Sequence, residues 1–249
     1  MLLNQPASVL ALYQHSLQLW TVTLRKIYPL ALACTFIPLL CSQYVSLQTD
    51  VALLNANRFD YNDITPFTLC LLLLNVIISM ASYATLLTYT RSLIDTQPLS
   101  AWMLAKRIAI KTPLLVFSGF LAILSLFVGF ILFILPGIYI FVVLFLFYPL
   151  VILEDNNPFK DFIHSFSLIK HHWWRTFFSL TLPIFLLTTF SLSCSKLLAY
   201  SLTPAHADTL RLSLRFLFQT LFMSVLFPWF CIQTLAVLHD LRLRRATAF

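Results

Sequence analysis

Six stretches of the chain are rich in apolar residues and nearly free of lysine, arginine, aspartate and glutamate. They cover residues 27–49, 66–90, 112–135, 137–153, 177–198 and 216–238, and Lys196, near the end of the fifth, is the one such residue among them. A helix that crosses a bilayer needs about 20 apolar residues, with a range of about 17–25. The pattern therefore predicts an all-α integral membrane protein with six transmembrane helices.

The third and fourth stretches come from one uncharged run that covers residues 112–153. As a straight helix this run would extend about 63 Å, twice the roughly 30 Å of a hydrocarbon core, so it must fold back. Pro136 and Gly137 form the predicted structural turn, because proline lacks a backbone donor and glycine tolerates a tight reversal. A re-entrant hairpin that does not cross the membrane is the alternative.

Three segments, residues 8–26, 95–111 and 157–175, alternate polar and apolar positions with a helical period. The third is the clearest, because Asn157 can cap a helix and Pro158 suits its first turn. Its apolar positions are Phe159, Phe162, Ile163, Phe166, Ile169 and Trp173. The pattern predicts three cytoplasmic interfacial amphipathic helices. Connecting loops that are amphipathic by chance are the alternative.

Each amphipathic segment precedes a pair of predicted spans. This order predicts a threefold repeat of amphipathic helix plus transmembrane hairpin, with units 1–90, 91–153 and 154–249. The repeats would together form a single polytopic membrane domain, residues 1–249.

Composition and charge refine this picture. Hydrophobic residues make up 60% of the chain and charged residues 10%, and the mean hydropathy is +0.88, which excludes an ordinary globular surface. Segments on one side of the predicted membrane hold twelve basic residues, against three on the other side, or four with Lys196. The positive-inside rule then places both termini in the cytoplasm. The net charge of +7 reflects topology and attraction to anionic headgroups, and we infer no nucleic-acid partner from it.

Two groups of basic residues are candidate contacts for anionic lipid. The first group belongs to the amphipathic segments and consists of Arg25, Lys26, Lys106, Arg107, Lys111, Lys170 and Arg175. The second is a candidate outer-face basic cluster of Lys196, Arg211 and Arg215. These three side chains could hold an anionic headgroup, or they could simply extend to the interface as long basic side chains do.

No catalytic or metal site emerges from the sequence, and we expect no cofactor. Glu154, Asp155, Asp161, His164 and His171 lie close in sequence, but His164 and His171 would be about 10.5 Å apart along a helix, too far to share one ion. No charged residue or histidine lies at the centre of a predicted span, which disfavours ion-driven transport. The known motifs of hydrolases and nucleotide-binding enzymes are also missing.

Four consecutive motifs carry a family resemblance. They are QPLSAWMLA from Gln97, ILPGIYI from Ile134, FYPLVILEDNNPF from Phe147 and KDFIHSFSLIKHHWWRTF from Lys160. The chain resembles the YciC-type family of bacterial inner-membrane proteins and, more loosely, the membrane domain of some glycerophosphodiester phosphodiesterases. The resemblance implies a multi-pass protein of the bacterial cytoplasmic membrane with no assigned activity, and the phosphodiesterase activity does not transfer because the catalytic domain is absent.

Two functional hypotheses follow. The first is a non-enzymatic protein whose interfacial helices bind anionic lipid, in envelope organisation or lipid handling. The alternative is a passive or partner-driven transporter of a small amphiphilic molecule, with Asn75, Ser79 and Gln219 lining a cavity.

Overall fold

The computed structural model describes residues 5–55, 66–97, 99–154, 157–201 and 208–247. Within these ranges the chain forms seven α-helices and no strand, so the predicted all-α class is confirmed. The helices are α1 (Val9–Asn55), α2 (Pro66–Ile94), α3 (Ala101–Leu132), α4 (Ile134–Leu153), α5 (Pro158–Ile169), α6 (Trp173–Ser201) and α7 (Asp208–Thr247).

Five of these helices, α1, α2, α3, α4 and α7, have described portions that are long and apolar enough to cross a membrane. The chain is therefore a multi-pass membrane protein. The remaining predicted span, residues 177–198, lies in α6, and its passage through the membrane stays a prediction.

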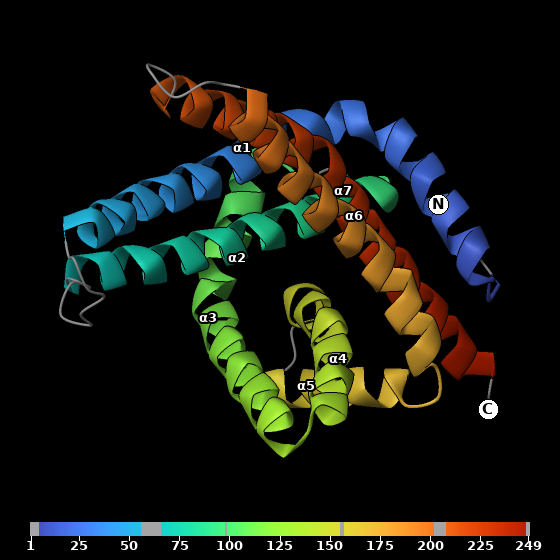
Figure 1. Ribbon diagram of the computed structural model, residues 1–249. Helices are drawn as coiled ribbons and strands as arrows, with labels where there is room; N and C mark the ends of the chain where they lie inside the picture. Colours follow the sequence, from blue (N-terminus) through green and yellow to red (C-terminus); the bar gives the residue numbers. More distant parts are fainter. Residues whose placement is uncertain (1–4, 56–65, 98, 155–156, 202–207, 248–249) are drawn as a thin grey trace.

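The long helices pair into three hairpins, α1 with α2, α3 with α4, and α6 with α7. In the view of Figure 1 the first hairpin extends to the left, the second to the bottom and the third to the upper left. The C-terminal half of α7 lies where they meet, and nearly all its side chains from Trp229 to Leu241 are buried. This half of α7 is the core on which α1, α4 and α6 pack.

The first two predicted interfacial helices are not separate helices. Residues 9–26 form the first part of the uninterrupted helix α1, and residues 101–111 form the start of α3. One face of the first segment packs on protein, since the Trp229 indole donates a hydrogen bond to the Ser16 hydroxyl (3.2 Å) and the Trp20 indole donates to the Val225 carbonyl (2.9 Å). Pro29 and Pro113 follow the two predicted boundaries closely, but both helices continue through these prolines into the spans.

The reversal between α3 and α4 lies at Phe133, not at Pro136 and Gly137. Phe133 is extended, and it is both the C-cap of α3 and the N-cap of α4. Pro136 falls in the first turn of α4, where its missing N–H leaves no helical bond unmade. Gly137 permits close packing instead, because a Cβ there would lie 2.5 Å from the Phe130 ring. The proline and glycine therefore start α4 and bring it against α3.

The third predicted amphipathic helix, residues 157–175, is confirmed in part: α5 ends at Ile169, and the segment from Trp173 onward belongs to α6. The Asn157 side chain accepts a hydrogen bond from the Phe159 N–H (3.2 Å), and Pro158 occupies the first turn, which confirms the predicted helix start. The Ser165 hydroxyl donates to the Val143 carbonyl of α4 (2.7 Å). In Figure 1, α5 crosses the α3–α4 hairpin instead of running along it.

Candidate functional site

Helix α5 buries Pro158, Leu168 and Ile169 against the protein and also exposes a stripe of large apolar side chains. Asp161 and Ser165 are fully buried, whereas Phe159, Ile163 and Phe166 are exposed, Ile163 by 67%. On a soluble protein the large apolar side chains of an amphipathic helix face the core. The exposed stripe, with Lys160 and Lys170 near its ends, has the character of a helix that lies at a lipid surface.

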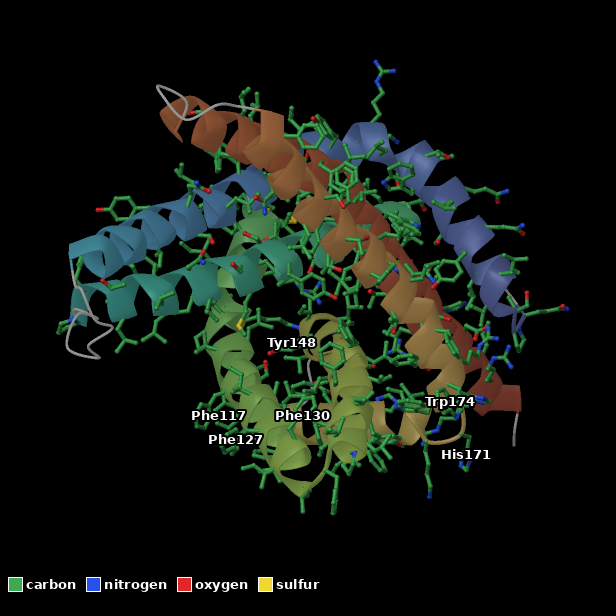
Figure 2. All side chains as sticks on the ribbon, viewed as in Figure 1. Phe117, Phe127, Phe130, Tyr148, His171 and Trp174 are labelled. Atoms are coloured by element: carbon green, nitrogen blue, oxygen red, sulfur yellow. The ribbon has the colours of Figure 1, made fainter. Side chains whose placement is uncertain are left out.

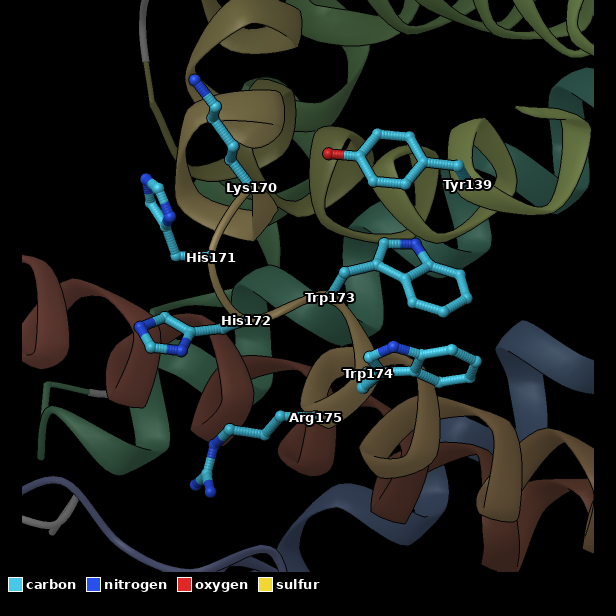
Figure 3. Close-up of a pocket in the computed structure, with 7 residues that line it drawn as sticks. All are labelled: Tyr139, Lys170, His171, His172, Trp173, Trp174 and Arg175. Atoms are coloured by element: carbon cyan, nitrogen blue, oxygen red, sulfur yellow. The ribbon is translucent and has the colours of Figure 1, made fainter. Parts of the chain in front are cut away.

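A pocket of about 440 Å³ opens at the turn between α5 and α6, and we call it the turn pocket. Figure 3 shows Tyr139, Trp173 and Trp174 on one side of the turn and the imidazoles of His171 and His172 on the other. Its seven lining residues are Tyr139, Lys170, His171, His172, Trp173, Trp174 and Arg175. The pocket thus combines basic and aromatic groups.

Aromatic contacts hold the turn against the first part of α4. The rings of Tyr139 and Trp173 stack with centroids 6.0 Å apart, and Phe166 of α5 meets Tyr139 edge-on at 5.6 Å. Trp174 is 66% exposed and stacks on Phe178 one turn further along α6, at 6.2 Å. Tryptophan and tyrosine favour the headgroup level of a bilayer, and phenylalanine suits the adjoining hydrocarbon.

Arg175 lines the pocket, but its guanidinium is bound elsewhere. Asp240 of α7, 3% exposed, accepts hydrogen bonds from Arg175 Nε (3.2 Å), Arg244 Nε (2.9 Å) and the Ala7 N–H (2.8 Å). Both arginines also donate to the Ala7 carbonyl. We call Ala7, Arg175, Asp240 and Arg244 the anchor cluster. It places the two ends of the described chain on the same side of the protein and leaves Lys170 and His171 as the exposed basic groups of the pocket.

A second polar cluster joins α3, α4, α5 and α7. Arg242 pairs with Glu154, and His164 Nδ1 lies 3.7 Å from the other carboxylate oxygen of Glu154. Lys111 Nζ donates to the carbonyls of Ile152 (2.8 Å) and Glu154 (3.1 Å). Lys111 thereby binds carbonyl groups at the C-terminal end of α4, where a cation is favoured by the helix dipole.

The predicted lipid contacts therefore fall into three sets. Arg25, Lys26, Lys106, Arg107 and Lys170 are exposed, and of these Lys170 alone lines the turn pocket. Lys111 and Arg175 are half-buried in the two clusters just described. The side chains of Lys196, Arg211 and Arg215 lie outside the described part of the structure.

His172 has an altered acidity. Burial, followed by the nearby positive charges of Arg244, Arg175 and His171, lowers the pKa of His172 below its usual value, against a smaller opposing effect of Asp240. The neutral imidazole is therefore the favoured form near neutral pH.

The described residues hold no group of three histidine, cysteine, aspartate or glutamate side chains that could bind a metal ion. The turn pocket instead has groups suited to an anion next to an apolar chain. Sequence reasoning missed Tyr139 and Asp240. The spacing of Asp240 and Arg244 was a local signal of pairing, but the contact of Tyr139 with Trp173 depends on the tertiary fold.

A second cavity, of about 430 Å³, lies between α2, α3, α4 and α7, and we call it the membrane cavity. Its lining is mostly apolar, with hydroxyl groups from Ser79, Tyr83 and Tyr148. Ser79 was expected to line a cavity and does so, whereas Asn75 and Gln219 are not among its lining residues.

Comparison of the chain with protein-family models, curated proteins and solved structures finds no match, so its function has to be inferred from its own geometry.

Proposed function

We propose that this membrane protein binds anionic lipid headgroups at the turn pocket and is a non-enzymatic protein of lipid handling or envelope organisation. One observation carries the proposal: exposed basic groups, Lys170 and His171, share a pocket with the aromatic side chains of Tyr139, Trp173 and Trp174. The phosphate group of the bound lipid would lie beside Lys170, and the first part of the lipid's acyl chains would lie beside Trp174 and Phe178.

The proposal includes a bacterial cytoplasmic membrane, with the turn pocket and both termini on the cytoplasmic side. The twelve-to-three distribution of basic residues supports this orientation. The hydrogen bond from Ala7 to Asp240 joins the two ends of the described chain and so supports their position on one side of the membrane. The anionic leaflet surface would then attract the exposed Lys106 and Arg107 as well.

The decisive experiment compares lipid binding by two lysine variants at opposite ends of α5. The protein is placed in nanodiscs with phosphatidylglycerol and phosphatidylcholine, and native mass spectrometry counts the lipids that remain bound. An exposed ion pair with a bound phosphate contributes up to about 1 kcal/mol, so Lys170→Gln should weaken phosphatidylglycerol binding up to about fivefold.

Lys160→Gln is the matched control, because Lys160 is exposed at the other end of α5 and does not line the pocket. A much smaller loss is expected for it. Trp174→Ala tests the aromatic wall without a change of charge, and it should weaken binding as well. Equal losses for Lys160→Gln and Lys170→Gln would contradict a pocket and indicate diffuse attraction to the surface.

A further inference from the structure

The membrane cavity and the turn pocket share none of their described lining residues, so the membrane cavity is a separate site. All four of its helices, α2, α3, α4 and α7, are long and apolar enough to cross a membrane. Its volume of about 430 Å³ lies within the range of roughly 300–1,000 Å³ typical of sites for small molecules. A hydrocarbon environment therefore surrounds a ligand-sized cavity.

The lining of the cavity limits what it can hold. None of the described residues that line it is charged, and Ile123, Phe141 and Phe145 form much of its apolar wall. A charged group would lose its hydration there without gaining an ionic partner. The part of a ligand inside the cavity is therefore uncharged and largely hydrocarbon.

Tyr148 supplies one directed polar group. Its hydroxyl faces α3, since a Cβ placed on Gly119 would lie 3.5 Å from the oxygen, and Figure 2 shows Tyr148 between α3 and α4. Within the described part of the chain this hydroxyl makes no hydrogen bond, whereas the Ser79 hydroxyl donates to the Asn75 carbonyl (2.8 Å). A free donor in apolar surroundings favours a ligand that brings an acceptor.

We propose that the membrane cavity binds one acyl chain of a diacyl membrane lipid, with an ester carbonyl that accepts a hydrogen bond from the Tyr148 hydroxyl. The chain lies along the apolar wall formed by α3 and α4, and the charged headgroup stays outside the cavity. This site is independent of the headgroup site at the turn pocket, and each can fail without the other.

Photolabelling tests the position of the chain. The probe is phosphatidylglycerol with a diazirine on one acyl chain, incorporated in nanodiscs, and mass spectrometry of peptides locates the label. We expect label on the peptides that contain Ile123 and Phe141. Ile123→Trp fills the cavity from an exposed position and should reduce this label at least fivefold.

Ile131→Trp is the matched control, because Ile131 is equally exposed on α3 but lies outside the cavity lining. Both variants must have the same size-exclusion elution volume and melting temperature as the unaltered protein. Cavity label that is insensitive to Ile123→Trp, or no stronger than label on the α3–α4 tip, would overturn the proposal, because bulk lipid then accounts for it.

Tyr148→Phe tests the carbonyl contact at constant volume. Unlabelled diester lipid should compete with the photolabelled lipid roughly threefold to tenfold less strongly in this variant, as expected for one lost hydrogen bond. Competition by a diether lipid of the same chain length, which lacks the carbonyl, should not change. An equal effect on both lipids, or none on the diester, would overturn the assignment of the carbonyl.

Discussion

The tip of the α3–α4 hairpin and the α5–α6 turn both expose large apolar side chains, but in different chemical settings. At the tip, Phe133, Ile134 and Leu135 are each at least 70% exposed, and no charged residue occurs from residue 112 to 153. At the turn, exposed Trp174 lines the same pocket as Lys170 and His171, and Arg175 of the anchor cluster lines it too. The tip therefore fits hydrocarbon alone, whereas the turn fits the boundary between hydrocarbon and headgroups.

The two regions are also held in place by different forces. The hairpin depends on close helix packing, with Gly129 and Gly137 allowing α3 and α4 to approach. The turn depends on Asp240, which binds Arg244 four residues along α7 and joins Arg175 and the Ala7 amide, both far away in sequence. A change that breaks the anchor cluster should therefore destabilise the turn and spare the hairpin. A change that prevents close packing of α3 and α4 should do the reverse.

The largest effect is expected for Asp240→Ala. This change leaves Arg175 and Arg244 without their carboxylate in a half-buried site, and breaking such a pair costs roughly 3–5 kcal/mol. Asp95→Ala is the control, because Asp95 pairs with Arg91 at an exposed position and its loss should cost at most about 1 kcal/mol. Unfolding in mixed micelles measures both, and equal stability losses would contradict the anchor cluster.

An intermediate effect is expected for Gly137→Leu in the hairpin. The new side chain meets the Phe130 ring and forces α3 and α4 apart, and overpacking of this kind costs roughly 1–3 kcal/mol. Pro136→Ala, one residue earlier, should change stability little, because the first turn of a helix needs no N–H from that position. The same unfolding assay measures both variants. A larger loss for Pro136→Ala would indicate that the proline, and not the packing, determines the hairpin.

The smallest effect is a pH dependence at the turn. The folded state lowers the pKa of His172, so it binds this proton less readily than the unfolded chain does. The stabilising contribution is complete above the unfolded pKa of about 6.5 and decreases as the pH falls below that value. His172→Gln should flatten the slope of stability against pH between about 7 and 5. An unchanged slope would show that His172 does not cause the pH dependence.

Local sequence signals predicted some elements well. The uncharged apolar runs predicted the long helices, and Asn157 with Pro158 predicted the start of α5, because caps and hydropathy act over a few residues. The same signals misplaced the hairpin turn, since a proline and a glycine suit the first turn of a helix as well as a reversal. They also predicted an interfacial helix separate from the span where α1 and α3 are each one continuous helix, because an amphipathic pattern does not reveal whether a helix continues.

The candidate site was only partly predictable. Lys170 was identified from its place in an amphipathic segment, and it lines the turn pocket. The engagement of Arg175 by Asp240 was missed, because the partners lie 65 residues apart and meet only after α6 and α7 pack. Burial on folding, which sequence patterns report poorly, decides which basic groups remain exposed for a ligand.

The depth of two spin labels tests the central comparison most directly. Ile131→Cys and His171→Cys are labelled with a nitroxide in a background without the five native cysteines, Cys34, Cys41, Cys70, Cys194 and Cys231. In liposomes, the label at position 131 should collide mainly with oxygen, as in hydrocarbon, and the label at position 171 mainly with a water-soluble nickel chelate. If both labels show the same accessibility, the α5–α6 turn is not a headgroup-level site, and the account of lipid binding is wrong.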